Sequence, residues 1–342
     1  MKKNSRWMKG IAVAAIAAMS VGMLAGCGSD NSQQEEKMYK VGIVQLMQHG
    51  ALDQSNQGMV DGLKAGGYEE GKNLEINQQN AQGDQSNLQS IAQQFLSDDV
   101  DMILSIATPS TQVMAAATED IPIVGTAITS FEQAGLVDSD EAPGTNVTGT
   151  HDMTPVAEQI DLLLQVVPDA KTIGTIYTSS EKNSQIQVGI LKEVCAEKGL
   201  AVEERTITSV NDIQQAAQSL VGEVDAIWLP TDNNVASAMP QVVGVTDEAG
   251  LVTICGEESM VRAGGTATYG FSYYQLGYNA GVMAAQILKG EGEPATMPIQ
   301  YMPQEDCVAI VNTDAVAILG IDVPADLLEG ATQVTTGSVA EE

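Results

Sequence analysis

Two short polar segments, each expected directly after a strand, carry residue types that could bind a small charged molecule. The first is Thr108-Pro109-Ser110-Thr111, which follows an apolar run at 102–106. Thr108 is a natural N-cap and Pro109 suits the first helical turn, so the free N–H groups of a helix would favour an anion here. The Ser110 or Thr111 hydroxyl could add a hydrogen bond. Ordinary helix capping without a ligand would explain the same residues.

The second segment is Thr231-Asp232-Asn233, in the second half of the chain. The Asp232 carboxylate could cap the following helix, bind an ammonium group, or do both through its two oxygens. Glu257 follows a strand expected at 251–255 and is another anionic candidate, although a surface carboxylate is equally compatible with so acidic a chain.

Further polar side chains follow the first expected strands of each half. They could hydrogen-bond a ligand, while helix capping is the alternative, and they are Gln45, His49, Ser179, Ser180 and Asn183. Thr126 follows the strand expected at 121–124 and is a candidate similar to Thr108–Thr111. Met47, Phe271 and Tyr273 are candidates for an apolar wall, although such residues near strand ends are more often part of a core.

Catalytic chemistry finds little support in the residues. The chain has only two histidines, His49 and His151, and it lacks G-x-S-x-G, H-E-x-x-H, P-loop and dinucleotide signatures. A Ser-His-Asp site through His49 has no supporting motif. Cys195, Cys255 and Cys307 are widely spaced without a C-x-x-C pair, which argues against a zinc site or a disulfide framework. We therefore expect no enzyme, no cofactor and no metal site.

The elements that would position these residues alternate between strands and helices. Apolar, β-rich runs lie at 41–44, 74–77, 102–106 and 121–124, and a second series lies at 172–177, 202–206, 226–229 and 251–255. Helical patterns separate the runs, which predicts parallel sheets with right-handed crossovers. The fold class is therefore α/β, with two doubly wound parallel-sheet lobes.

An internal repeat supports two related lobes. Residues 86–104 (SNLQSIAQQFLSDDVDMIL) and 211–229 (NDIQQAAQSLVGEVDAIWL) each show an apolar helix face followed by a Val-Asp pair and a buried strand. Chance similarity between two amphipathic helices is the alternative. If the repeat is real, Thr108 and Asp232 lie at equivalent carboxyl ends of strands, where open α/β sheets bind ligands.

A helix at 273–289 and a strand at 308–311 suggest that the chain returns to the first lobe and then to the second. Several crossings would make a hinge. The predicted bounds are 39–148 plus 272–300 for lobe one, 149–271 plus 301–332 for lobe two, and 333–342 for a tail.

The N-terminus has the features of an export signal. Four basic residues precede an apolar run at 10–26, which is at the lower limit for a membrane span and reads instead as a secretory signal. Leu24-Ala25-Gly26-Cys27 is similar to a bacterial lipobox, in which the cysteine becomes the lipid-modified (palmitate-bearing) first residue. A plain secretory signal that happens to contain a cysteine is the alternative. Residues 27–38 read as a flexible tether.

The charge excludes some partners. Removing residues 1–26 takes away four basic and no acidic residues, so the formal charge of −30 becomes −34. A surface this acidic repels nucleic acid and anionic lipid head groups.

Seven segments together carry a resemblance over about residues 40–330: QNAQGDQSNLQSIAQQF, IATPSTQ, IPIVGTAIT, NVTGTHDM, DAIWLPTDNNVASAM, EESMVRAGGTATYGFSYYQLG and AAQILKGE. The chain resembles the ABC-transporter substrate-binding lipoproteins of the tryptophan/tyrosine-binding type, which have the type I periplasmic-binding fold. The resemblance implies a receptor that works with a permease and an ATPase, and it favours an aromatic amino acid as ligand and His49 as a site residue. An acidic residue often stands in the family where Ser272 stands here, so one partner of a cationic amine would be missing.

The sequence thus predicts a lipid-anchored, extracytoplasmic, monomeric receptor whose cleft closes on a small zwitterion. The carboxylate would lie at Thr108–Thr111 and the ammonium near Asp232. The alternatives are a surface receptor or adhesin with the same fold, or a purine, sugar or peptide ligand in the same cleft.

Overall fold

The computed structural model describes residues 37–339, and the chain from residue 37 onward forms a compact unit by itself. The predicted signal segment and Cys27 lie outside the described residues. Within residues 37–339, no helix is both long and apolar enough to cross a membrane.

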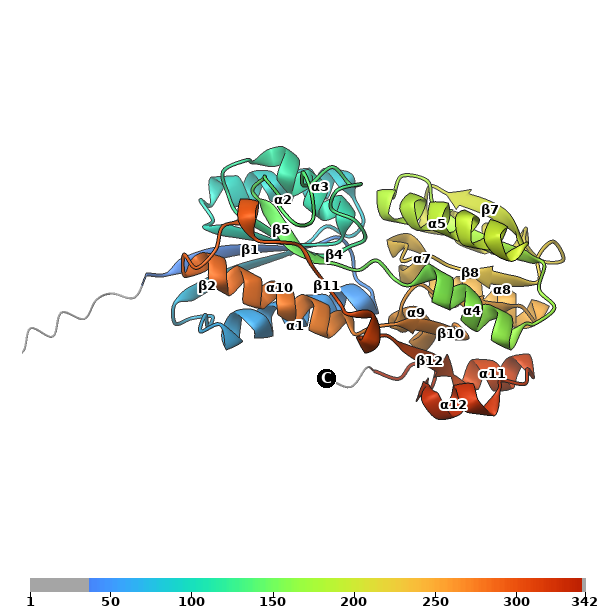
Figure 1. The fold of residues 1–342 in the computed structure, drawn as a ribbon. Coiled ribbons are helices and arrows are strands. Elements are labelled where there is room, and N and C mark those ends of the chain that lie inside the picture. Colours follow the sequence, from blue (N-terminus) through green and yellow to red (C-terminus); the bar gives the residue numbers. More distant parts are fainter. Residues whose placement is uncertain (1–36, 340–342) are drawn as a thin grey trace, which may run out of the picture. The chain divides into compact units, whose positions relative to one another are not determined.

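Two mainly parallel sheets organise two lobes (Figure 1). The first sheet has the order β11-β5-β4-β3-β1-β2, and its strands are β1 (Tyr39–Gln45), β2 (Leu74–Asn80), β3 (Met102–Ile106), β4 (Ile123–Ile128), β5 (Val147–His151) and β11 (Gln300–Tyr301). The second has the order β13-β12-β10-β9-β8-β6-β7, and its strands are β6 (Thr172–Thr178), β7 (Ala201–Ile207), β8 (Ala226–Trp228), β9 (Val252–Ile254), β10 (Ala267–Gly270), β12 (Val308–Asn312) and β13 (Thr332–Val334).

The two lobes share one winding pattern. The consecutive orders β2-β1-β3-β4-β5 and β7-β6-β8-β9-β10 both match the doubly wound type in which ligands bind at the point where the order reverses. Among the strands of residues 37–339, only β10 and β12 pair antiparallel. The predicted fold class is confirmed, and the common strand order supports the predicted repeat.

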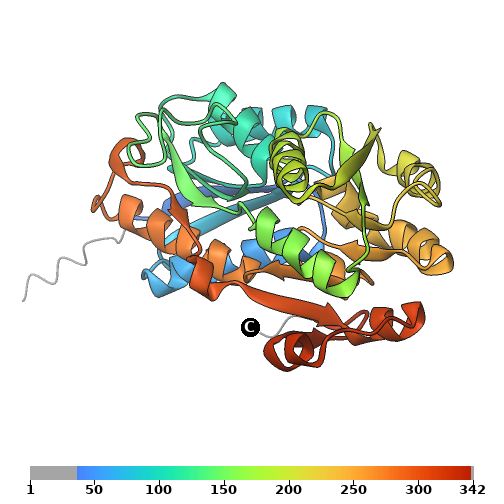
Figure 2. The ribbon, with the colours of Figure 1, turned by 45° about the vertical axis from the view of Figure 1, so that its right-hand side comes forward.

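Helices cover both faces of each sheet. Lobe one has α1 (Gly50–Ala65), α2 (Gln85–Ser97), α3 (Thr108–Ala117) and α10 (Tyr273–Leu288). Lobe two has α4 (Val156–Val166), α5 (Lys182–Lys198), α6 (Ile213–Gln218), α7 (Asn233–Ser237), α8 (Met239–Ala249), α9 (Glu258–Arg262), α11 (Thr313–Leu319) and α12 (Ala325–Gly330). The last two helices lie beside β12 and β13 at one edge of the second sheet (Figure 2). Short 3-10 turns occur at Val210–Asp212, Pro294–Thr296 and Gln304–Asp306.

The chain crosses between the sheets three times in the described residues: after β5, between β10 and α10, and between β11 and β12. The predicted lobe limits at 148 and 300 fall inside β5 and β11, because the pairing of His151 with Tyr301 extends the first sheet to those residues. The exact lobe limits stay a prediction.

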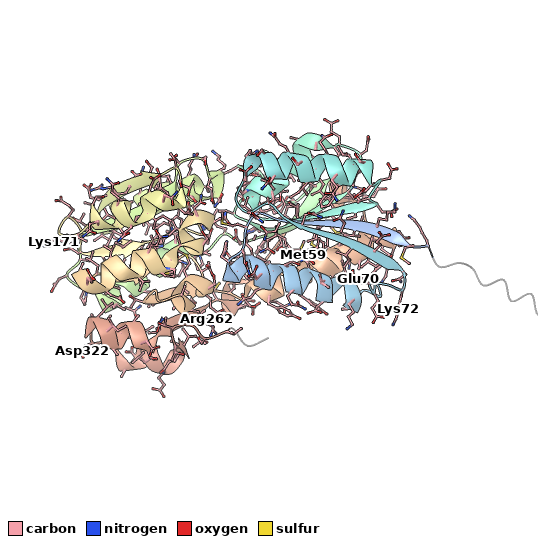
Figure 3. All side chains as sticks on the ribbon, turned by 180° about the vertical axis from the view of Figure 1, so that it is seen from behind. Met59, Glu70, Lys72, Lys171, Arg262 and Asp322 are labelled. Carbon is pink, nitrogen blue, oxygen red and sulfur yellow. The ribbon has the colours of Figure 1, made fainter. Side chains whose placement is uncertain are left out.

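Close packing of α1 against α10 depends on glycine. A Cβ atom built on Gly281 of α10 would lie 2.2 Å from the carbonyl oxygen of Met59, and one on Gly277 would lie 2.1 Å from that of Ser55. Gly62 on α1 faces the carbonyl oxygen of Tyr278 in the same way, at 2.2 Å. Figure 3 labels Met59 on α1. The two backbones therefore touch where any side chain would separate them.

We expect Gly281→Ala to lower the free energy of unfolding, because the added methyl group must push α10 away from α1 and overpacking costs about 1–3 kcal/mol. Gly189→Ala in α5 is the matched control, since a Cβ there meets no atom within 4 Å. Alanine is the better helix former, so the control should gain about 0.5–1 kcal/mol. Urea unfolding of both variants checks the opposite signs, and equal effects would contradict the packing argument.

Candidate ligand-binding site

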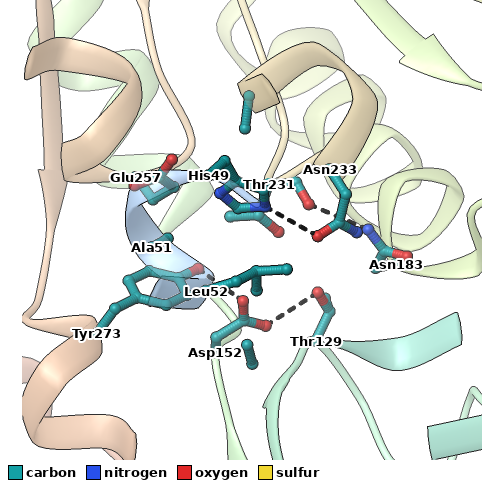
Figure 4. Close-up of a pocket in the computed structure, with 12 residues that line it drawn as sticks. His49, Ala51, Leu52, Thr129, Asp152, Asn183, Thr231, Asn233, Glu257 and Tyr273 are labelled. Atoms are coloured by element: carbon teal, nitrogen blue, oxygen red, sulfur yellow. Dashed lines mark hydrogen bonds between the residues drawn. The ribbon is translucent and has the colours of Figure 1, made fainter. Parts of the chain in front are cut away.

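A small cavity lies between the two lobes, beyond the carboxyl ends of their parallel strands (Figure 4). The enclosed volume is about 10 Å³, room for about one water molecule, so the lining side chains meet closely in this arrangement. Its lining residues are His49, Ala51, Leu52, Ala127, Thr129, Asp152, Asn183, Thr231, Asn233, Ala236, Glu257 and Tyr273. Both lobes contribute, as expected for a ligand held at two facing switch points.

Two buried carboxyl groups give the cavity an acidic character. Asp152 follows β5 and is 3% exposed. It accepts hydrogen bonds from the Tyr273 hydroxyl at 2.6 Å and from the Thr129 hydroxyl at 3.1 Å. Burial raises the pKa of Asp152 against the lowering effect of these two hydrogen bonds.

Glu257 caps the short helix α9 and accepts from the backbone N–H and hydroxyl of Ser259. Burial raises the pKa of Glu257 to about 7. Neither lysine nor arginine occurs among the lining residues, so neither residue type pairs with these carboxyl groups from within the lining.

The lining also offers amide and imidazole groups. His49 Nε2 lies 3.2 Å from Asn233 Oδ1, a hydrogen bond that joins lobe one to lobe two. Two buried atoms of the lining, His49 Nδ1 and Asn183 Oδ1, have no hydrogen-bond partner in the described part of the chain. Burial also lowers the pKa of His49, which favours a neutral imidazole at neutral pH.

Backbone geometry brings two further features to the cavity. Helix α1 begins at Gly50 without a side-chain cap, and His49, Ala51 and Leu52 all line the cavity. The N-terminus of α1 therefore presents N–H groups and a partial positive charge there. Ala127 has a φ of 55°, where β4 shifts register against β5. Strained backbone of this kind is concentrated at functional sites.

Five of the predicted site residues line the cavity: His49, Asn183, Thr231, Asn233 and Glu257. Gln45 does not, because its side chain is buried in hydrogen bonds with Asp53, Asn56 and the Met47 carbonyl oxygen. Ser272 is exposed and caps α10 by accepting from Gln275 N–H.

Asp232 is the clearest departure from the predicted site. It is fully buried, and its two oxygens accept four hydrogen bonds, from Thr178 N–H, the Thr178 hydroxyl, the Ser184 hydroxyl and Val235 N–H. It lies outside the cavity lining. These hydrogen bonds use both oxygens, so no carboxylate oxygen of Asp232 is free for a ligand ammonium in this arrangement, and the ammonium position beside it stays a prediction.

The turn at Thr108–Thr111 also lies outside the lining. Thr111 bonds to Ser105 and to the Ala107 carbonyl oxygen, and Thr126 bonds to Thr150. The hydroxyls of Thr108 and Ser110 are buried and have no partner among residues 37–339. Ser179 and Ser180 are exposed, and the Ser179 hydroxyl donates to the Ile207 carbonyl oxygen.

The sequence analysis missed Asp152 and Thr129 as site residues, and it gave Tyr273 only as a wall candidate. Asp152 could have been found from the β-branched run that ends at Thr150, because a carboxylate just past a strand end is the same signal that selected Glu257. The hydrogen bonds that join Asp152 to Thr129 and Tyr273 span three separate segments and leave no local pattern.

Two lobes with the same winding order, enclosing a cavity at their facing carboxyl ends, define a solute receptor of the type I periplasmic-binding fold. The model for the family "ABC transporter substrate binding protein" matches residues 40–335, and the chain belongs to this family. It is thus a substrate-binding protein of ABC-transporter type and not an enzyme, which confirms those two predictions and fits an extracytoplasmic protein.

Similar proteins agree with this assignment. The chain is 39% identical to a tyrosine-binding protein of Clostridioides difficile over 88% of this chain and 89% of that protein. A structure from Streptococcus pneumonia in complex with L-Trp is 35% identical, with a TM-score of 0.84, over 87% of this chain and all of that one. The ligand-free, open structure of a Clostridium difficile substrate-binding protein with adhesive properties is 42% identical, with a TM-score of 0.67, over the same shares.

We expect the ligand-free protein to lose thermal stability between about pH 4.5 and 7, because Glu257 is protonated more readily in the folded state than in the unfolded state. Its folded pKa, about 7, lies above the unfolded value, so the stabilising proton is lost as the pH rises through 7. Glu257→Gln should flatten this part of the curve, as followed by the melting temperature against pH. Glu258→Gln is the control, and an unchanged slope in Glu257→Gln would contradict the assignment.

Proposed function

We propose that this chain is the lipid-anchored substrate-binding subunit of an ABC importer for an aromatic amino acid. The observation that carries the ligand class is the pair of buried carboxyl groups, Asp152 and Glu257, in a lining without lysine or arginine. A buried charge needs a partner, and a ligand ammonium group would supply it. The relatives named for tyrosine binding and solved with L-Trp support the same class.

The ligand's parts can be assigned to the lining. The ammonium group lies between Asp152 and Glu257, and its third proton reaches one of the free acceptors. The carboxylate lies at the N-terminus of α1, where N–H groups and the helix dipole favour an anion. Thr108 and Ser110, at the start of α3, remain a second candidate for the carboxylate because their buried hydroxyls are unpaired. Tyr273, Leu52, Ala127 and Ala236 form the wall beside the aromatic ring.

Closure on the ligand is supported by the similarity scores. The open, ligand-free relative is more identical in sequence than the L-Trp complex, yet its TM-score is lower. That inversion is expected if the present chain has the closed arrangement. The His49–Asn233 bond across the cleft is consistent with a closed state.

The anchor and partners follow from the sequence. Cys27 becomes the acylated first residue, residues 27–38 act as a tether, and the closed receptor, a monomer, docks on a permease coupled to an ATPase. Cys27→Ala should prevent labelling by palmitate and move the protein from the membrane fraction to the soluble fraction. Membrane retention of Cys27→Ala would argue for a different anchor.

We expect tyrosine, tryptophan or phenylalanine to raise the melting temperature of residues 37–342 in a screen with amino acids, nucleosides and sugars. A ligand present at a hundred times its dissociation constant adds about 2.7 kcal/mol to a protein that it binds only when folded. Stabilisation by a purine, sugar or peptide instead would keep the receptor and contradict the ligand class.

Asp152→Asn should weaken binding of the stabilising amino acid by roughly 2–5 kcal/mol, because it removes the charge opposite a desolvated ammonium. Isothermal titration measures the loss, and Asp322→Asn, at an exposed carboxylate far from the lining (Figure 3), is the control. Equal affinities for wild type and Asp152→Asn would remove Asp152 from the site.

A further inference from the structure

Glu181 is a buried carboxyl group that lies behind the cavity lining. It is 4% exposed, directly before α5, and its side chain does not cap that helix. Instead its Oε2 atom accepts from Asn183 Nδ2 at 2.8 Å, from Asn233 Nδ2 at 2.6 Å and from Asn233 N–H at 3.2 Å. Both asparagines line the cavity, so one carboxylate oxygen contacts two ligand-site amides from behind.

These contacts fix the orientation of both amides. Asn183 Nδ2 also donates to the Thr231 carbonyl oxygen at 3.0 Å. Turning the Asn183 amide over would place its oxygen against that carbonyl and against the carboxylate, which are both acceptors. The same holds for Asn233, whose Nδ2 lies on Glu181. The amide oxygens of both residues are therefore turned away from Glu181, and Asn183 Oδ1 is left buried and unpaired in the lining.

The orientation of Asn233 in turn fixes the proton on His49. Asn233 Oδ1 can only accept, so His49 Nε2 must be the donor of the hydrogen bond across the cleft. A neutral imidazole with its proton on Nε2 has a lone pair on Nδ1. That atom is buried and has no partner in the described chain. The hydrogen bonds between Glu181 and Asn233 and between Asn233 and His49 thus leave His49 Nδ1 as an acceptor in the lining. Asn183 Oδ1 is the second free acceptor there.

We propose that Glu181 is a positioning residue for ligand recognition, which holds Asn183 and Asn233 so that the lining presents hydrogen-bond acceptors to the ligand ammonium and joins the lobes through His49. This inference rests on the proposed function for the nature of the ligand. It gives a physical basis for selecting amino acids over analogues that lack the amine, because an acceptor-only wall leaves a ligand without that donor facing unpaired lone pairs.

The setting of Glu181 makes its charge sensitive to pH near neutrality. Burial and the neighbouring Asp232 raise the pKa of Glu181 to about 8. We call the hydrogen bonds of Glu181 with Asn183 and Asn233 the clamp. The titratable groups nearest the clamp are Asp232, which follows β8, and His49 from lobe one. A neutral Glu181 keeps one carbonyl-type acceptor, so glutamine is the conservative replacement and alanine the disruptive one.

Binding of the amino acid identified in the ligand screen tests the role by isothermal titration. Glu181→Ala should lose about tenfold or more in affinity, and Glu181→Gln should stay within about threefold of wild type because its oxygen still accepts. Glu181→Asp keeps the acidic group but moves its oxygen away from Asn183 and Asn233, so it should lose as much affinity as Glu181→Ala. It is the variant to measure if Glu181→Ala does not fold. Asn234→Ala, next to Asn233 on α7 and away from Glu181, is the matched control. Wild-type affinity in both Glu181→Ala and Glu181→Asp would overturn the proposal.

A double-mutant cycle separates positioning from general stability. Because Glu181 acts through its amides, Glu181→Ala should have little further effect on affinity in an Asn233→Ala background, whereas it should add to Asp152→Asn, which lies across the cavity. Discrimination between the amino acid and its analogue without the amine should also fall in Glu181→Ala. Equal losses in all backgrounds, with unchanged discrimination, would show a merely structural residue.

One measurement does not depend on the ligand. In the free protein, the side-chain NH₂ resonances of Asn183 and Asn233 should shift together through the pKa of Glu181, about 8, and Glu181→Gln should abolish this shared titration in the NMR spectrum. If wild type binds no amino acid but the shared titration is seen, the proposed ligand class fails while the clamp stands. If the side-chain NH₂ resonances of Asn183 and Asn233 are the same in wild type and Glu181→Ala, the clamp is overturned whatever the ligand.

Discussion

The backbone contact between α1 and α10 is the constraint on which the site depends. Helix α1 belongs to the first segment of lobe one, whereas α10 returns to that lobe only after the chain has built most of lobe two. The two helices pack with carbonyl oxygens of each against glycines of the other, and these glycines are Gly62, Gly277 and Gly281. Because both helices begin at the cavity, this contact sets the position of Leu52 relative to Tyr273. A side chain in the contact would therefore change the wall of the cavity as well as the stability of the lobe.

Electrostatics give the cavity its chemical character. Asp152 and Glu257 are buried with hydrogen-bond donors but without a lysine or arginine in the lining. Asp232 has the same burial and four donors, which stabilise its charge internally. Equally buried carboxyl groups thus divide into one whose hydrogen bonds are complete and two that face open space. The number of donors around each carboxyl group, rather than its burial, distinguishes Asp232 from the two carboxyl groups that we propose bind the ligand.

The alternation of strands with helices and the internal repeat were sufficient to predict two doubly wound lobes, because both can be recognised in short stretches of sequence. The N-cap at Asp232 was likewise predictable, since capping depends on the next few residues, whereas the cap at Glu257 was not predicted. The distinction between them was not predictable, because Thr178 and Ser184, which supply three of the four donors to Asp232, come from a strand and helix more than forty residues away. The repeat overestimated α6, which ends at Gln218 and leaves Val221 39% exposed. Cavity residues joined across segments, such as Asp152 and Tyr273, need the folded chain to be recognised.

Two site residues lie on the connections between the lobes, and this location has a kinetic consequence. Asp152 directly follows β5 where the chain leaves lobe one, and Tyr273 begins α10 three residues after β10 ends. Points close to a rotation axis move least, so the hydrogen bond between these two side chains can persist while the lobes separate. His49 and Asn233, which belong to different lobes, must part. The rate at which a ligand binds the open receptor would then depend on Asp152 and Tyr273 at the hinge. The residence time of the bound ligand would depend on the contact between His49 and Asn233 across the cleft.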